Sequence, residues 1–210
     1  MFFSFDGLDG VGKTTQLDRF CEWLRRAGHE VVSCYDPGST PLGEAVRKIL
    51  LERGEMAIDR RSEMLLFMAA RAELVAEVIR PALAAGKTIV SDRYLLANVV
   101  YQGYAGGLDV DEIWNIGRMA TAGIKPDLTF VLDMPPQSAF GRIERPLDRM
   151  EIQTAEFQNR LRHGFLTEAA RLPAEIVVID ASRSVDAVQA DIRREALRVL
   201  EAKQEAGRKP

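Results

Sequence analysis

A glycine-rich segment near the N-terminus constrains the fold of this chain more than any other feature. Residues 7–14 read Gly-Leu-Asp-Gly-Val-Gly-Lys-Thr and match the pattern G-x-x-x-x-G-K-[ST] in full. An apolar run at residues 2–5 predicts a strand before the segment, and an amphipathic pattern at residues 13–27 predicts a helix after it. Such a strand–loop–helix unit belongs to a parallel α/β sheet, and its backbone N–H groups can hold a phosphate.

Short apolar runs alternate with longer helical patterns along the rest of the chain. Further strands are predicted at residues 31–34, 88–91, 128–132 and 176–179. Further helices are predicted at residues 42–53, 60–85, 111–121, 138–145, 155–170 and 185–202. This alternation is typical of a parallel sheet covered by helices on both faces. We therefore expect a single three-layer α/β domain over residues 1–202, with a five-stranded parallel sheet, and a polar, frayed tail over residues 203–210.

The charge balance and the rarity of metal-ligating residues argue against several classes of protein. A net charge of -3 disfavours a chain that coats nucleic acid, because such a chain needs a surplus of Lys and Arg. The two cysteines and two histidines lack the spacing of a zinc site. No stretch approaches the roughly 20 apolar residues of a membrane span, and the N-terminus lacks a basic export signal. We therefore expect a cytoplasmic protein with reduced thiols and with neither nucleic acid nor a membrane as partner.

Two clusters of polar residues predict a nucleotide site with a divalent metal ion. In the glycine-rich loop, Lys13 can reach the β- and γ-phosphate oxygens of a nucleoside triphosphate, and Thr14 can offer its hydroxyl to Mg²⁺. After the third predicted strand, Asp92 can complete the shell of that ion and Arg93 can bind a phosphate. A solvated surface charge pair is the alternative reading of Asp92 and Arg93.

The glycine-rich loop alone does not define the reaction, since GTPases, ATPase motors, helicases and small-molecule kinases share it. The chain has no guanine-binding N-K-x-D segment, and it is small and acidic. These features favour a small-molecule phosphotransferase.

A series of short segments, spread in order over residues 3–197, shares its residue pattern with a known family. The segments are residues 5–15, Asp-Pro-Gly at 36–38, Leu-Phe-Met-Ala-Ala-Arg at 66–71, Asp-Arg-Tyr at 92–94 with Asn98, Tyr-Gln-Gly at 101–103 and Lys-Pro-Asp-Leu at 125–128. With them the chain resembles the thymidylate kinases of the bacterial type, which are P-loop nucleoside monophosphate kinases. The resemblance implies the P-loop NTPase fold with a small lid over about residues 141–150. It also implies ATP and dTMP as substrates, Mg²⁺ as cofactor and a homodimer.

The resemblance also implies roles for individual residues. Phe67 would stack on the thymine ring, Arg71 would donate to a thymine carbonyl and Asn98 would read the ring N3–H. For Phe67 the apolar helix pattern by itself favours plain core packing. The ATP site would comprise Gly7, Leu8, Asp9, Gly10, Val11, Gly12, Lys13, Thr14, Thr15 and Arg142. The dTMP site would comprise Asp36, Arg47, Phe67, Arg71, Arg93, Asn98, Tyr101 and Gln102.

Within these sets, some residues would hold the sugar and the phosphates of the substrates. Asp9 and Tyr101 would hold the deoxyribose and leave no room for a 2′-hydroxyl. Arg93 would bind the acceptor phosphate, and Arg47 is a second candidate that fits a solvated helix position equally well. We expect Lys13, Asp9, Arg93 and two lid arginines to be catalytic. The resemblance implies that the lid supplies the catalytic arginine because the P-loop lacks one, and it leaves Arg145 and Arg149 as the candidates because Arg142 would lie against the adenine ring.

The chain departs from the family pattern at three places. Tyr35 stands where the family shows an arginine, Ala97 where it commonly shows a serine, and the lid is about two residues short. Two alternatives therefore stay open beside dTMP kinase. One is a kinase of another nucleoside monophosphate or of a deoxynucleoside, and the other is a nucleotide-binding regulator that has lost turnover.

Overall fold

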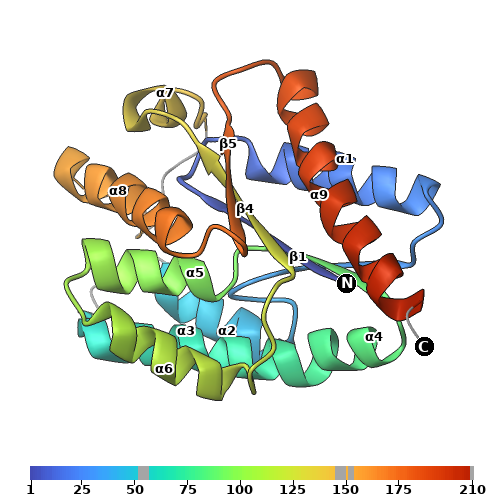
Figure 1. Ribbon diagram of the computed structural model, residues 1–210. Helices are drawn as coiled ribbons and strands as arrows, with labels where there is room; N and C mark the ends of the chain where they lie inside the picture. The colour runs from blue at the N-terminus through green and yellow to red at the C-terminus, as the bar shows by residue number, and fades with distance from the viewer. Residues whose placement is uncertain (52–56, 145–149, 151–153, 209–210) are drawn as a thin grey trace.

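Five parallel strands form one sheet at the centre of the computed structural model, which describes residues 1–51, 57–144, 150 and 154–208. The strands lie in the order β2-β3-β1-β4-β5, and Figure 1 shows the sheet between two layers of helices. Their bounds are β1 (Phe2–Gly7), β2 (Val31–Tyr35), β3 (Thr88–Asp92), β4 (Leu128–Asp133) and β5 (Ile176–Asp180). The predicted α/β fold and all five predicted strands are confirmed, and each observed strand ends one or two residues later than predicted.

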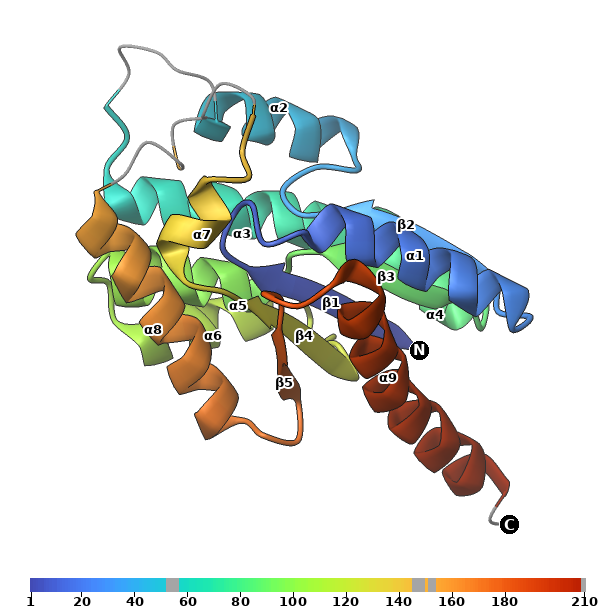
Figure 2. The same cartoon turned by 90° about the horizontal axis from the view of Figure 1, so that it is seen from above.

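The helices cover both faces of the sheet. Helices α1 and α9 pack on one face, and α4, α5 and α8 reach the other, where α3 and α6 lie beside them (Figure 2). Their bounds are α1 (Lys13–Arg26), α2 (Pro41–Leu51), α3 (Arg60–Leu74), the π-helix η1 (Val75–Ile79), α4 (Arg80–Ala84), α5 (Leu95–Asn98), the π-helix η2 (Val99–Ala105), α6 (Val110–Ala120), α7 (Pro136–Phe140), α8 (Ala155–Arg171) and α9 (Val185–Arg208). None of the helices in the described ranges is long and apolar enough to span a membrane.

Several predicted helix boundaries need correction. The predicted helix at residues 60–85 is three consecutive segments with the π-helical turn η1 in the middle, and α5 with η2 is absent from the sequence prediction. The helix predicted at residues 138–145 is α7, which begins at Pro136 and ends at Phe140, before a turn at Gly141.

The expected frayed tail is helical over residues 203–208, which form the last turns of α9. Ala, Lys, Gln and Glu, which are good helix formers, make up residues 201–206. In addition, the Lys203 ammonium contacts the Asp127 carboxylate at 2.6 Å. Local propensity and this long-range ion pair together explain why the helix continues.

The central strand β1 is buried on both faces because helices cover the sheet on each side. Phe3 and Phe5 contact Phe20 of α1 and Phe130 of β4, with ring centroids 5.0–6.0 Å apart. Each such aromatic pair contributes about 0.5–1.5 kcal/mol beyond the burial of its area. The apolar run that predicted this strand is therefore the centre of the core, and it fixes the position of the loop that follows.

One carboxyl group, that of Asp6, is buried with the apolar residues of β1. Its side chain is fully buried, Oδ2 accepts a hydrogen bond from the Ser4 hydroxyl at 3.2 Å, and Oδ1 has no partner among the described residues. Burial raises the pKa of Asp6 from its ordinary 3.8 to about 7, although Arg93 and Lys13 oppose the shift. The charged form of Asp6 therefore opposes folding.

Replacing Asp6 by Asn should stabilise the protein more at pH 8 than at pH 5. Because the pKa of Asp6 is higher in the folded than in the unfolded chain, wild-type stability falls as the pH rises from about 4 to 7, and a neutral Asn removes that dependence. Between pH 5 and pH 8, the free energy of unfolding of the variant minus that of the wild type should increase by roughly 2–3 kcal/mol. Urea unfolding at both pH values measures this, and an equal difference at the two pH values would contradict it.

Candidate active site

A cavity of about 940 Å³ lies at the carboxyl edge of the sheet, where the loops after β1, β2, β3 and β5 meet. This is the edge at which parallel α/β sheets bind ligands. Residues of α3 and η2 close its far end. The predicted residues that line the cavity are Asp9, Gly10, Val11, Gly12, Lys13, Thr14, Thr15, Asp36, Arg47, Phe67, Arg71, Asp92, Arg93, Asn98, Tyr101, Gln102 and Arg142.

The loop after β1 has a backbone that only glycine allows at Gly10. Its φ is +83°, and a Cβ there would lie 2.0 Å from the carbonyl oxygen of Ala139. The loop leads directly into α1, whose first residue is Lys13. The predicted phosphate-binding loop therefore has the curled backbone and the helix N-terminus that its motif requires.

The ammonium group of Lys13 lies folded against its own loop. It donates to the carbonyl oxygens of Gly7 at 3.2 Å and Leu8 at 2.7 Å, and it contacts Asp9 Oδ1 at 3.3 Å. Burial, with Arg93 nearby, lowers the pKa of Lys13. Gly7 and Leu8 do not line the cavity, so their part is to supply these two carbonyl oxygens.

The side chain of Arg93 lies between the glycine-rich loop and η2. Its backbone takes a φ of +67°, a left-handed conformation that is strained for a residue with a side chain. The guanidinium donates to Gly7 O at 3.1 Å, to Asp9 Oδ1 at 2.5 Å and to the Tyr101 hydroxyl at 3.1 Å. These bonds, with the backbone bond from Arg93 N to Phe5 O at 2.8 Å, hold the strained conformation in place.

The carboxylate of Asp9 joins three elements of the site. Besides Lys13 and Arg93 it accepts from the Tyr101 hydroxyl at 3.1 Å. Burial by itself would raise the pKa of Asp9, but Arg93 and Lys13 outweigh it and hold that pKa well below its usual range. Asp9, Arg93 and Tyr101, which the family resemblance assigns to the sugar and phosphate of the acceptor nucleotide, are thus in direct contact with one another.

At the far end of the cavity Arg71 forms a buried ion pair with Asp36. Arg71 Nε donates to Asp36 Oδ2 at 2.5 Å, and the two side chains are 2% and 0% exposed. Arg71 Nη1 donates to Asn98 Oδ1 at 2.9 Å and contacts the Met68 sulfur, and Nη2 contacts the Tyr94 carbonyl. A guanidinium has five N–H donors. The contacts above use four of them, so among the described residues one donor remains for a ligand. The half-buried ring of Phe67 lines the same end.

A second cation reaches the cavity from α2. Arg47 Nη1 donates to the Pro37 carbonyl at 2.9 Å, and its guanidinium lies over the Tyr35 ring, 5.3 Å from the centroid. Tyr35 is the position where we expect the family to carry an arginine. The neighbouring helix therefore supplies positive charge to a region whose expected arginine is missing.

Hard oxygen donors line the cavity beside the phosphate loop. They are the Thr14 hydroxyl and the Asp92 carboxylate. Within the described ranges no group of three or more His, Cys, Asp or Glu side chains could by itself enclose a metal ion. This donor set suits Mg²⁺, which usually takes one or two protein oxygens, several waters and the substrate phosphates.

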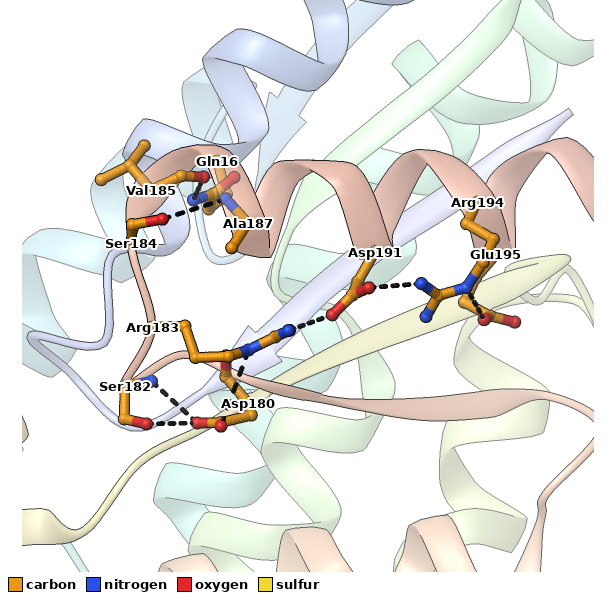
Figure 3. Close-up of polar contacts among 10 residues, drawn as sticks. All are labelled: Gln16, Asp180, Ser182, Arg183, Ser184, Val185, Ala187, Asp191, Arg194 and Glu195. Atoms are coloured by element: carbon orange, nitrogen blue, oxygen red, sulfur yellow. Dashed lines mark hydrogen bonds and ion pairs between the residues drawn. The ribbon is translucent and has the colours of Figure 1, made fainter.

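The loop between β5 and α9 is not among the site residues predicted from the sequence, and it lines the cavity with Ala181, Arg183 and Val185. Figure 3 shows the polar contacts that hold this loop: Ser182 N and Oγ donate to Asp180 Oδ1 at 3.0 and 2.6 Å, and Arg183 pairs with Asp191. Gln16 of α1 donates to the Val185 carbonyl at 2.9 Å. Polar residues after the fifth predicted strand were the available signal.

The two lid arginines that we expected to be catalytic, Arg145 and Arg149, lie outside the described residues. The described lid residue Arg142 lines the cavity.

Comparisons with known proteins identify the family to which the chain belongs. The family model described as thymidylate kinase matches residues 5–192. The chain is 45% identical over 195 residues to a thymidylate kinase of Bifidobacterium longum (strain DJO10A), covering 91% of this chain and 95% of that protein. It is 42% identical over 185 residues to a thymidylate kinase of Rhodopirellula baltica, covering 88% and 75%.

A solved structure is similar over nearly the whole chain. The crystal structure of thymidylate kinase from Ehrlichia chaffeensis superposes with a TM-score of 0.77 at 30% identity, covering 94% of this chain and 98% of that one. With the phosphate loop and the lining of the cavity described above, these matches show that the chain belongs to the thymidylate kinase family.

Proposed function

We propose that this thymidylate kinase binds ATP at the phosphate-loop end of the cavity and dTMP at the Arg71 end, and transfers the γ-phosphoryl group to the dTMP 5′-phosphate. The observation that carries the proposal is that one cavity joins a phosphate loop to Phe67, Arg71 and Asn98. Arg93 lies between the two ends, bonded to the phosphate loop and to η2. The products are dTDP and ADP.

At the ATP end, the loop amides and Lys13 bind the phosphates. On binding, Lys13 exchanges the carbonyl oxygens of Gly7 and Leu8 for β- and γ-phosphate oxygens. Thr14 and Asp92 would hold Mg²⁺, which when bound neutralises phosphate charge. Arg142 would lie against the adenine ring.

At the dTMP end, Phe67 stacks on the thymine while Arg71 and Asn98 contact its polar edge. Arg71 Nη1 donates to Asn98 Oδ1 at 2.9 Å, so the remaining Nη2 donor of Arg71 and the Asn98 oxygen belong to neighbouring groups. The 4-carbonyl and N3–H of thymine present the matching acceptor and donor. Asp9 and Tyr101 hold the deoxyribose, and Arg93 and Arg47 bind the acceptor phosphate.

The chemistry needs positioning and charge neutralisation rather than a general base, because the acceptor phosphate is already a nucleophile. Lys13 and Arg93 hold the donor and acceptor phosphates in line. Arg145 and Arg149 remain the proposed lid arginines that stabilise the charge developing on the transferred group. A cytoplasmic location stays a prediction from the sequence.

We also propose that the chain forms a homodimer through helices α2, α3 and α6. These helices are neighbours, and each exposes a large apolar side chain: Ile49 is 46% exposed, Leu65 53% and Met119 78%. Exposed apolar side chains on neighbouring helices favour a protein interface.

A substrate panel tests the proposed acceptor. In a coupled ADP-release assay with ATP and Mg²⁺, dTMP should be used with a higher kcat/KM than dUMP, dCMP, dGMP, UMP, CMP, AMP or GMP. Arg93→Ala should lower kcat/KM for dTMP by about 100-fold or more, because a charged contact to the phosphate is lost. Equal use of all acceptors by the wild type would contradict the assignment of the base site, and unchanged activity of the variant would contradict the role of Arg93.

Phe67→Ala should raise KM for dTMP about tenfold and leave KM for ATP unchanged, because only stacking on the base is removed. Leu197→Ala is the control, since Leu197 is an exposed apolar residue on α9 that lies outside both the cavity and the proposed dimer interface. If Phe67→Ala has the same KM for dTMP as the wild type, Phe67 does not bind the base and only packs in the core.

Met119→Glu should convert the homodimer to a monomer, because a carboxylate would be buried at the proposed interface. Size-exclusion chromatography with light scattering measures the mass. Leu197→Glu is the control, since Leu197 is 44% exposed on α9, which packs on the opposite face of the sheet. A wild-type monomer, or a variant that stays dimeric, would refute this interface.

A further inference from the structure

A chain of five buried polar side chains runs from the base end of the cavity into the helical layer behind it. Arg71 Nε donates to Asp36, and Arg71 Nη1 donates to Asn98 Oδ1 at 2.9 Å. Asn98 Nδ2 donates to Gln102 Oε1 at 2.6 Å, and Gln102 Nε2 donates to Glu63 Oε1 at 2.9 Å. The exposed fractions of these five residues are between 1% and 9%.

The hydrogen bonds that join Arg71 to Glu63 run in one direction, which the residues at the two ends determine. A guanidinium can only donate, and a carboxylate can only accept. If the amides of Asn98 and Gln102 were reversed, an NH₂ group would face Arg71 and a carbonyl oxygen would face Glu63. Both contacts are repulsive in a buried site. The hydrogen bonds therefore run in one direction, from Arg71 to Glu63.

Glu63 stands outside the substrate cavity. Arg71, Asn98 and Gln102 line the cavity, and Glu63 does not. Glu63, Phe67 and Arg71 follow at intervals of four on α3, so they share one face of that helix. Asn98 and Gln102 are also four residues apart. One helix face thus carries both a residue that contacts the base and a residue behind it.

We propose that Glu63 is a positioning residue for base recognition. Through Gln102 it fixes the direction of the Asn98 amide, so that Asn98 presents its oxygen beside the donor of Arg71. Thymine offers N3–H to that oxygen, whereas cytosine has an N3 acceptor and a 4-amino donor, the reverse pattern. The inference rests on the proposed function, because it takes Asn98 as the residue that reads N3–H.

Exchanging the carboxylate and the amide between positions 63 and 102 tests the proposal with nearly isosteric variants. In Glu63→Gln the new amide oxygen can still accept from Gln102, so kcat/KM for dTMP should stay within about fivefold of wild type. In Gln102→Glu the carboxylates at positions 63 and 102 repel each other, which displaces the acceptor that holds the Asn98 amide in place, so the dTMP-to-dCMP ratio of kcat/KM should fall at least about tenfold.

The double variant Glu63→Gln, Gln102→Glu should restore the ratio to within about fivefold of wild type. There the new amide at position 63 and Asn98 Nδ2 can both donate to the carboxylate at position 102, and the net charge equals that of the wild type. KM for ATP should be the same in all four proteins. Glu77→Gln in the Gln102→Glu background is the matched control, because exposed Glu77 lies on η1 and should not restore the ratio.

The outcomes separate this inference from the proposed function. A wild type that uses dCMP as well as dTMP, or a dTMP preference that survives Asn98→Ala, overturns the assignment of the base site itself. Two outcomes overturn only the role of Glu63 when the wild type prefers dTMP. In the first, Gln102→Glu keeps the full dTMP-to-dCMP ratio of kcat/KM. In the second, the double variant has a ratio as low as that of Gln102→Glu. If Gln102→Glu does not fold, thermal unfolding of the double variant tests the role of Glu63. A double variant that folds and prefers dTMP supports that role, and one that does not fold refutes it.

Discussion

The arrangement of the phosphate site depends on a carboxylate between two cations. Asp9 accepts hydrogen bonds from Lys13 and Arg93, which are held in a water-poor pocket and would otherwise repel each other. Tyr101 completes the contact from η2. Because Asp9 belongs to the phosphate loop, Arg93 follows β3 and Tyr101 lies on η2, this carboxylate ties the loop to the elements that would surround the acceptor nucleotide. When the substrate phosphates bind, their oxygens can replace the protein oxygens that accept hydrogen bonds from Lys13 and Arg93, and these two cations are already in position.

Burying charge serves placement more than stability in this protein. The Asp36–Arg71 pair is almost fully buried, and the desolvation of two such ions costs about as much as their attraction returns. The pair provides a guanidinium that is fixed at one end of the cavity and that donates to Asn98. The buried Asp6 carboxyl shows the same cost, because Arg93, Lys13 and the Ser4 hydroxyl do not offset its burial, which raises its pKa to about 7.

The π-helical segment η2 helps to bring the site together. The segment η2 follows directly on α5 and carries Tyr101 and Gln102 into the cavity, while Asn98 ends α5. A π-turn shifts the direction of the residues that follow it and is common at functional sites. Here it allows Tyr101 to reach Asp9 and Gln102 to reach Glu63 from one short segment.

The sequence by itself determined the features that depend on neighbouring residues and on short patterns. These are the five strands, the phosphate loop with its curled backbone, and, through the family motifs, the cavity residues Phe67, Arg71 and Asn98. Tertiary structure alone decided contacts between residues far apart in the chain. They include the contacts of the β5–α9 loop at the cavity, the ion pair between Lys203 and Asp127, and the hydrogen bond from Gln102 to Glu63. The physical reason is that hydrophobic periodicity and glycine conformation act locally, whereas a hydrogen bond between side chains 39 or more residues apart exists only after packing brings them together.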